Sequence, residues 1–551
     1  MPTYIRKNAW DANNGGQFTD QDGNYTQLYW YAKAVQELQN IPISQATSWW
    51  FWSAIHGEYL LKKLPKPYSY LNWVNIAYIP ESANLSNPPP SQITNLFWDQ
   101  CQHGSWYFPP WHRGYLVGLE NLLRSVVEQL GGPSDWALPY WNYLNQSKVY
   151  PEYQIPPAFL ALTLPDGTSN PLYVPERYGP DGNGNIYVQV GQNMQEDAND
   201  ECQWDTIYTE GDKPSQPGPG DLYGYFYGGG ETGFSHNGSE TGDLEQNPHN
   251  FVHGMVGGVS NTNKQNGLMG VPATAALDPV FFLHHANIDR MWTAWNVTGN
   301  NQNTDNPNWL NGPTANGHSQ FAMPLDASGT PWYYTPQQVQ DTMELIYNGS
   351  VYSYTYDDLS LTSYDTTPPP QLRSRLKQRS DKLNITGIKD GINMAKKKLE
   401  LVGASSGSLS LKNQAVETNV RIDGDAWTPV LKSFLKTARE DSSGASLPDE
   451  VILQLEGVKG ANDPGFLSVF VNKQFVKTVS LFGLQSASME DGPQGGAGLT
   501  FRFNITNIVD ELHLSNNLDI NALDVEVKTK NPIADGSDIT IGRIGIYRLS
   551  K

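Results

Sequence analysis

Cysteine and positive charge are both scarce in this sequence. Only two of its 551 residues are cysteine, Cys101 and Cys202, which excludes a disulfide framework and leaves at most one bridge. Lys and Arg number 36 against 56 Asp and Glu, so the formal charge is −20. A surface of this charge repels phosphate groups, and we therefore expect neither nucleic acid nor an anionic membrane as a partner.

Long apolar runs are also missing. No stretch of about 18 apolar residues occurs, so no membrane-spanning helix is expected. Residues Met1–Trp10 contain no apolar core of a secretion signal, which makes the cytoplasm the default expectation for localisation.

The pattern of apolar residues changes along the chain and predicts two domains. Within 1–360, helical spacing predicts helices over 46–61, 111–130 and 278–295, with Thr47 or Ser48 and Asp278 as N-caps. From 396 to 551, apolar residues alternate between Gly and Asn turns, which predicts a small all-β sandwich.

Residues 361–395 are predicted to be a linker between these domains. Between Gln371 and Glu400, nine Lys or Arg stand against three Asp or Glu, which is unusual in so acidic a chain. A charge run of this kind is most often a solvated linker, and the alternative is a protease-sensitive activation site.

Six of the ten histidines fall into three clusters within residues 1–360: His56, His103, His112, His249, His253 and His285. Neutral imidazole is a preferred copper ligand, and three such ligands leave a coordination position open.

His249 and His253, in PHNFVH, are four residues apart, so both rings share one face of a helix and can bind one metal ion. Such a pair often binds no metal, and zinc is a further alternative. A zinc protease would need Glu where Asn250 stands, which argues against peptide hydrolysis.

His112 and His285 each follow a phenylalanine by one helical turn, Phe108 and Phe281. Taken singly, each is explained as a packed core histidine, but two matching helices favour a buried site with two metal ions. Cys101 precedes His103 by two residues and is either a buried thiol, a metal ligand or a partner in a covalent cross-link.

Long patterns around these histidines resemble the tyrosinase and catechol oxidase family. CQHGSWYFPPWHRGYL with LPYWNY, then PHNFVH, then DPVFFLHHANIDRMW follow one another over about 250 residues in the family's order. The resemblance implies a mainly α catalytic domain in which a four-helix bundle holds two copper ions. His56, His103 and His112 would bind the first, and His249, His253 and His285 the second.

The choice of His285 over His284 follows the family pattern. Neighbouring residues on a helix point about 100° apart, so only one of the two is expected to reach the metal. The resemblance also implies a thioether between Cys101 and His103, and a structural ion pair between Arg113 and Asp289, because a buried charge needs a partner.

The same resemblance implies the reaction. Small phenols and O2 are the expected partners: o-diphenols would be oxidised to o-quinones, and monophenols hydroxylated to o-diphenols. Hydroxylation needs a base, and the family holds a water with a Glu and an Asn that match Glu245 and Asn250; Glu240 is a competing candidate. The position that gates access falls at Val271 and Pro272, where no bulky aromatic stands.

The C-terminal part resembles the domain that covers the active site in plant-type polyphenol oxidases. It is therefore expected to inhibit its own catalytic domain, with a plug after FLSVFVN; Phe475, Leu481 and Phe482 are the candidates. Three alternatives stay open: a reversible O2 carrier of the hemocyanin type, an o-aminophenol oxidase, and a structural zinc protein.

Overall fold

The computed structural model covers the whole chain and describes most of it. Outside the described residues lie 1–2, 12–13, 58–59, 61–72, 74–75, 77–78, 81–82, 84, 86, 146–148, 191–196, 210–224, 228–240, 314–319, 362–397, 412–414, 440–448, 463–464, 491–495, 516, 531–537 and 551. The predicted linker from 362 on therefore lies outside them, as do Glu240 and the basic segment 371–397.

The described residues up to 361 form a helical half. Its helices are α1 (Gln27–Gln39), α2 (Trp49–His56), α3 (Ser91–Phe97), α4 (Phe108–Gln129), α5 (Phe251–Gly257), α6 (Pro272–Ala275), α7 (Val280–Val297), α8 (Pro307–Asn311) and α9 (Pro336–Val339). Short 3₁₀ turns η4 (Pro157–Phe159), η5 (Glu201–Trp204) and η8 (Leu268–Gly270) and the segment η7 (Glu245–Asn250), which is kinked at Asn247, complete it. No described helix is long and apolar enough to cross a membrane.

The three predicted helices are present as α2, α4 and α7. The Ser48 hydroxyl accepts a hydrogen bond from the amide of Trp50, which makes it the N-cap of α2. The N-cap of α7 is Pro279, one residue after the predicted Asp278, although Asp278 Oδ1 accepts a hydrogen bond from the amide of Val280 at 2.9 Å. Ser48 and Asp278 thus bond amides that the first helical turn leaves unbonded.

Short strand pairs close the helical half. They are β1 (Tyr4–Arg6) parallel to β6 (Tyr354–Tyr356), β2 (Phe321–Pro324) with β3 (Pro331–Tyr334), and β4 (Leu345–Tyr347) with β5 (Ser350–Tyr352). The β1–β6 pair brings Tyr354 and Tyr356 to α7, where both hydroxyls donate to Asp289 Oδ2 at 2.7 and 2.5 Å.

The predicted ion pair between Arg113 of α4 and Asp289 of α7 is confirmed. Arg113 Nε on α4 lies 2.6 Å from Asp289 Oδ1 on α7, and both side chains are buried. Arg6 on β1 adds a second buried guanidinium, 3.0 Å from Asp289 Oδ2. Burial raises the pKa of the Asp289 carboxyl, but the two arginines outweigh it and hold that pKa below its usual value.

Residues from 398 form a β domain. Its strands are β7 (Lys398–Ala404), β8 (Leu409–Leu411), β9 (Ala415–Ile422), β10 (Glu450–Lys459), β11 (Phe466–Val471), β12 (Gln474–Ser480), β13 (Leu499–Asn504), β14 (Ala522–Thr529) and β15 (Ile539–Ser550). Three helices accompany them, α11 (Gly424–Arg439), α12 (Leu484–Ser488) and α13 (Thr506–Leu514).

These strands form one antiparallel sheet in the order β12-β11-β14-β9-β7-β15-β10-β13, with β8 on β15. The register pairs Val469 with Val527 and Leu453 with Ile546, side chains that belong to one apolar core. The end strands β12 and β13 contact each other, so the sheet curls almost into a barrel. The all-β prediction is confirmed, with one curled sheet in place of two flat layers.

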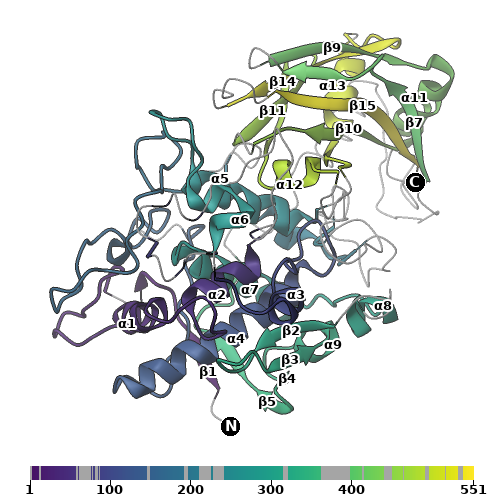
Figure 1. The fold of residues 1–551 in the computed structure, drawn as a ribbon. Coiled ribbons are helices and arrows are strands. Elements are labelled where there is room, and N and C mark those ends of the chain that lie inside the picture. Colours follow the sequence, from purple (N-terminus) through teal and green to yellow (C-terminus); the bar gives the residue numbers. More distant parts are fainter. Residues whose placement is uncertain are drawn as a thin grey trace.

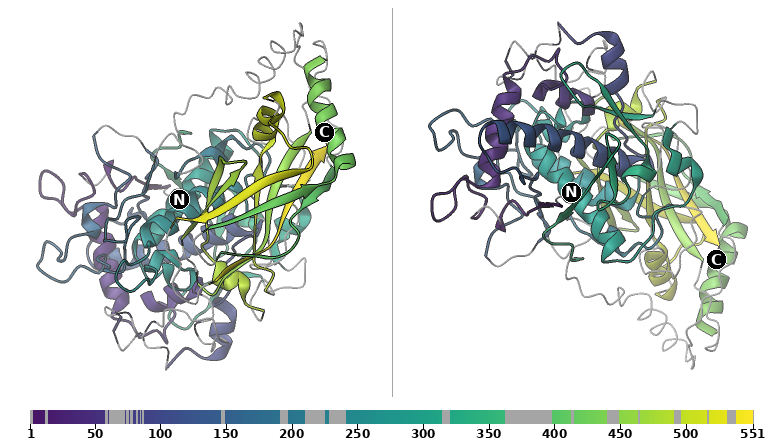
Figure 2. Two further views of the ribbon diagram at one scale, coloured as in Figure 1. Left: turned by 90° about the horizontal axis from the view of Figure 1, so that it is seen from above. Right: turned by 90° about the horizontal axis from the view of Figure 1, so that it is seen from below.

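The β domain sits on one end of the helical half, over α5 and α6 (Figure 1), and Figure 2 shows its curled sheet beside the helices from two further sides. Strand β12 contacts both η7 and α5. Phe466 of β11 packs on Phe251 with ring centroids 4.9 Å apart and belongs to the core of the helical half. At Gly254 a Cβ would lie 2.7 Å from the ring of Phe466, so glycine is what lets the two surfaces approach.

Candidate metal centre

The first group of predicted ligands comes together as expected. His56 ends α2, His112 lies in the second turn of α4, and His103 lies in the loop before α4. Their ring nitrogens and the sulfur of Cys101 all lie within 4.8 Å of one another, and all four residues are buried.

The second group lies against the first. His249 in η7 and His253 in α5 have ring centroids 4.5 Å apart, and His285 of α7 completes the set. The His112 and His285 rings stack at 4.6 Å, which joins the two groups into one buried site. The spacing prediction for His249 and His253 was right about proximity, and the helical turn that carries His249 follows a kink at Asn247, whose backbone is extended.

His284 also lies in the second group, but on its outer side. Its Nδ1 is 3.1 Å from the hydroxyl of Tyr143, and its ring contacts lie within the second group and with Tyr143. His285 instead faces the first group through His112. A ligand of a two-metal site has to face the space between the groups, so His285 stays the predicted ligand and Tyr143, which sequence reasoning missed, holds His284.

Two phenylalanines hold the rings in place. Phe281 packs on His285 at 4.1 Å and on His56 at 4.6 Å, so it contacts one ligand of each group. Phe108 does the same for His112 at 4.4 Å and His249 at 4.7 Å. The phenylalanine one turn before each helical histidine therefore packs across the centre.

Oxygen atoms near the Nδ1 atoms fix the orientation of four rings. These oxygens are the carbonyls of Pro272 (3.1 Å from His56), Phe108 (2.7 Å from His112) and Met269 (2.8 Å from His253), and Asn250 Oδ1 (2.9 Å from His249). Only a protonated Nδ1 can donate to such an oxygen, so the lone pair of each ring is on Nε2. Metal-binding histidines are generally oriented in this way by a second hydrogen bond.

The site also keeps its histidines neutral. Burial, together with the neighbouring imidazoles, holds the pKa values of His112, His249, His253 and His285 well below the usual value. His249 Nε2 is buried without a hydrogen-bond partner, and the Nε2 atoms of His253 and His285 face each other at 3.3 Å. Two facing groups of three buried imidazoles, four of them held neutral, fit two copper ions.

Cys101 is placed for the predicted thioether. Its sulfur lies 3.7 Å from Nδ1 and 3.8 Å from Nε2 of His103, which is the symmetric position expected beside the carbon between those nitrogens. The sulfur also lies 3.6 Å from His112 Nε2, so a role as a ligand of the first metal stays an alternative. Neither cysteine is in a disulfide.

We expect the peptide that contains Cys101 and His103 to be lighter by two hydrogens in copper-loaded protein, because a new C–S bond replaces one S–H and one C–H bond. Mass spectrometry of a proteolytic digest measures this, with Cys101→Ser as the reference of unmodified mass. If the wild-type peptide has its full mass and reacts with a thiol reagent after unfolding, there is no thioether. Cys101 would then be interpreted as a ligand of the first metal ion.

The predicted base is buried beside the ligands. Glu245 begins η7, is 1% exposed, and its Oε1 accepts a hydrogen bond from the amide of Gly104 at 2.7 Å. Burial raises the pKa of Glu245 to about 8. Asn250, its predicted companion, instead contacts His249, so its place in this structure is that of a residue that orients a ligand.

The mouth of the site is covered by the β domain. Phe482, which follows β12, stacks on His253 at 4.3 Å and also contacts His103 and His249, at 5.7 and 5.9 Å. The predicted gate residue Pro272 lies next to the residue that follows Phe482, since a Cβ on Gly483 would be 3.8 Å from Pro272. Of the other two plug candidates, Phe475 packs on Phe470 and Leu481 lies in the β-domain core, so Phe482 is the candidate that lies over the histidines.

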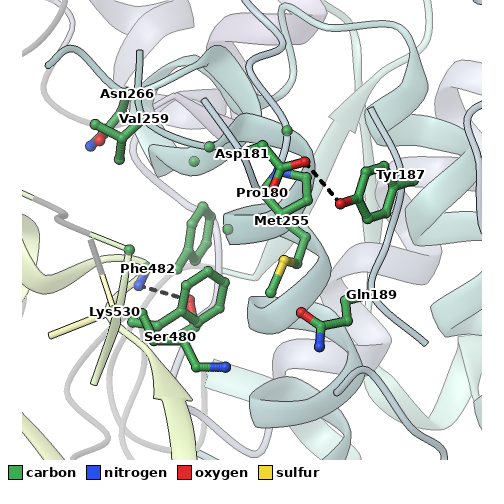
Figure 3. A pocket seen from close by; sticks show the side chains of 16 residues that line it. Pro180, Asp181, Tyr187, Gln189, Met255, Val259, Asn266, Ser480, Phe482 and Lys530 are labelled. Carbon is green, nitrogen blue, oxygen red and sulfur yellow. Dashed lines mark hydrogen bonds between the residues drawn. The ribbon is translucent and has the colours of Figure 1, made fainter. Parts of the chain in front are cut away.

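Figure 3 shows Phe482 at a cavity between the two domains, with Met255 of α5 on the opposite wall. The cavity holds about 280 Å³, and Phe482 is part of its lining. Sequence reasoning missed this arrangement, and it missed Phe466 on Gly254, because both depend on how the domains dock.

Comparison with known proteins now adds identity to this geometry. Residues 46–298 match the model of the common central domain of tyrosinase, a range that includes all six predicted ligands. Tyrosinase HcTyr1 of Hahella sp. (strain CCB-MM4) is 28% identical over 544 residues, which covers 94% of this chain and 96% of that protein. Residues 46–298 therefore belong to the family of tyrosinase central domains.

The family match agrees with the metal predicted for the site. Tyrosinases are dicopper oxidoreductases, and the two histidine groups are the described residues that could hold two copper ions. Chloroplastic catechol oxidase B of Solanum tuberosum is 33% identical over 215 residues, which is 38% of this chain and 33% of that protein. This chain thus matches about a third of the length of that plant relative.

Two solved structures share the whole fold. The latent apple tyrosinase superposes with a TM-score of 0.54 at 18% identity, covering 100% of this chain and 98% of that one. A latent aurone synthase gives 0.54 at 19% identity, with 100% and 90% covered. Residues 398–549, the β domain, match a model described as a domain of unknown function (DUF7868).

Proposed function

We propose that this family member oxidises o-diphenols to o-quinones with O2, hydroxylates monophenols to o-diphenols, and is kept latent by its own β domain. The observation that carries this proposal is the pair of three-histidine groups that face each other across one buried space, with Phe482 on top. When bound, two copper ions supply O2 binding and the redox chemistry of phenol oxidation.

The chain's own residues contribute position and a dry environment. The carbonyls and Asn250 that bond to Nδ1 atoms fix which nitrogen of each ring is a ligand. Phe108 and Phe281 exclude water from the space between the rings, which strengthens electrostatic interactions inside it. Val271 and Pro272 leave the gate without a bulky side chain, so a phenol ring fits once Phe482 has moved.

Glu245 is the proposed base for monophenols. A phenol has a pKa near 10, so its proton has to be removed before the ring can be hydroxylated, whereas a catechol loses its protons more readily. Glu245 is suited by place: its carboxylate bonds to the residue after His103 and lies one turn before His249, between the two groups. We propose that it accepts the phenol proton through a water molecule.

Glu245→Gln keeps the shape and removes the basic oxygen. We expect tyramine hydroxylation to fall by about 10²-fold relative to catechol oxidation, the usual contribution of general base catalysis. Asn250→Asp serves as the control from the same turn, because it changes the bond to His249 and should alter both activities together. An unchanged ratio of the two activities in Glu245→Gln would remove the glutamate from this role.

The β domain is the proposed intramolecular inhibitor. It supplies Phe482 over His253 and Phe466 over Gly254, and its strand β12 contacts the two elements that carry the second histidine group. While the two domains are linked, they bind each other at a high effective concentration, which cleavage of the basic segment 371–395 removes. We therefore expect cleavage to release the β domain from the histidine site.

The test uses copper-loaded protein, cut and uncut within 371–395, assayed with catechol and with tyramine. We expect both substrates to turn over in the cut protein and little in the uncut protein. Reversible O2 binding without catechol turnover after cleavage would identify an O2 carrier. Turnover of an o-aminophenol well above that of catechol would identify the aminophenol oxidase, and activity equal before and after cleavage would refute latency.

A further inference from the structure

Strand β12 places a lysine in an acidic recess of the helical half. Lys477 lies in the middle of this strand, five residues before Phe482, and its Nζ is 3.6 Å from Glu201 Oε2 on η5. Both side chains are partly exposed, 30% and 36%. Between described residues, no other ion pair joins the β domain to the helical half.

Two further carboxylates act on the same ammonium group, those of Asp243 and Asp205. We call Glu201, Asp205 and Asp243 the acidic socket. Burial lowers the pKa of Lys477, but Glu201 and Asp243 outweigh it, so that pKa stands above its usual value and the lysine is charged. The socket therefore sets three carboxyl groups against one cation.

We propose that Lys477 is the electrostatic latch of the β domain: its ammonium group, seated in the acidic socket, fixes β12 on the helical half and thereby holds Phe482 over the site. Its consequence for activity rests on the proposed latency, whereas the contact itself does not. Lys530 is another β-domain cation at this boundary, where it lines the cavity together with Asp181, but among the described residues it forms no ion pair. The aromatic contacts across the boundary, Phe466 on Phe251 and Phe482 on His253, are not charge pairs.

The position of the latch explains why one lysine is enough. Asp243 lies two residues before Glu245, at the start of the turn that leads to His249. Lys477 thus attaches β12 to the segment that carries His249. Because only five residues separate Lys477 from Phe482, this attachment also fixes the position of Phe482. A partly exposed pair is screened by salt, so the attachment weakens as ionic strength rises.

The experiment separates attachment from activity. A recognition sequence for a specific protease is placed within 371–395 of the copper-loaded full chain, the chain is cut, and the dissociation constant of the two halves is measured by sedimentation in a dilution series. We expect Lys477→Gln to raise that constant about tenfold and Lys477→Glu about 100-fold, since like charges then face each other across the contact.

The matched control is Lys528→Gln, which breaks an ion pair of 2.7 Å to Glu526 within the β domain and should leave the constant unchanged. Added salt should weaken the wild-type complex and leave Lys477→Gln nearly unaffected. Adding Glu201→Lys to Lys477→Glu should recover part of the lost affinity, which also shows that the variant domain is folded.

Equal constants for wild type, Lys477→Gln and Lys528→Gln would overturn the latch. Catechol oxidation by the uncut chain is the second readout. Halves that separate more easily in Lys477→Glu, with uncut activity unchanged, would support the latch and count against latency instead.

Discussion

Replacing Phe482 with alanine is expected to raise catechol oxidation by the uncut chain about tenfold or more, close to the rate of the cut protein. The ring stacks on His253 and reaches His103 and His249, so it occupies the place where a phenol ring would lie. Removing the ring leaves a space about as large as a phenyl group. This space adjoins the cavity of about 280 Å³, and together they give a small phenol a path to the site.

Phe475→Ala is the matched control for this variant. Phe475 is the same residue type on β12, but its ring packs on Phe470 at 5.4 Å within the β domain. We expect this variant to stay latent, although both replacements remove apolar contacts and lower the melting temperature of the β domain. Activation by both variants to the same extent would mean that domain unfolding, not the plug, releases activity.

The sequence predicted the histidines of the metal centre better than the β-domain residues that lie over them. Histidines at helical spacing, each one turn after a phenylalanine, are local features of α4 and α7, and such periodicity survives into the fold because one face of each helix is buried. His56 was predicted from the family pattern, and α2 does carry it into the first group.

The features that were missed depend on contacts between distant segments. Which of Phe475, Leu481 and Phe482 lies over the histidines depends on how the β domain docks, and the sequence left these three as equal candidates. Lys477 and Glu201 are 276 positions apart by number, and no local pattern joins them. The kink at Asn247 was likewise not predicted, since the residues EQNPHN of Glu245–Asn250 carry no apolar spacing.

The buried charge cluster behind the site leads to a second prediction with a large effect. Asp289 lies one turn after His285 on α7 and accepts four bonds, from Arg113, Arg6, Tyr354 and Tyr356. Asp289→Asn keeps the shape of the side chain but removes the negative charge that pairs with the buried guanidinium groups of Arg113 and Arg6. We expect the free energy of unfolding to fall by about 3–5 kcal/mol, the usual cost of breaking a buried ion pair.

Asp166→Asn is the control, because Asp166 pairs with Lys33 at 3.2 Å on the surface. Such an exposed pair contributes little, so its loss should change the free energy of unfolding little. A second carboxylate, Glu120, accepts from Arg6 Nε at 2.7 Å. A cost at Asp289 as small as that at Asp166 would show that Glu120 and the tyrosines are enough to satisfy the arginines.

Acid should abolish the difference between wild type and Asp289→Asn. The pKa of Asp289 is lower in the folded protein than its ordinary value of 3.8, so its stabilising contribution is complete above that value and is lost as the pH falls through the folded-state pKa. Unfolding by denaturant at pH 7 and at pH 3 measures this for both proteins. Arg113 is the residue after His112, and Asp289 lies one helical turn after His285, so the ion pair holds two predicted ligands in place. We therefore also expect Asp289→Asn to hold copper less tightly at pH 7. Metal analysis after dialysis against a chelator would show this.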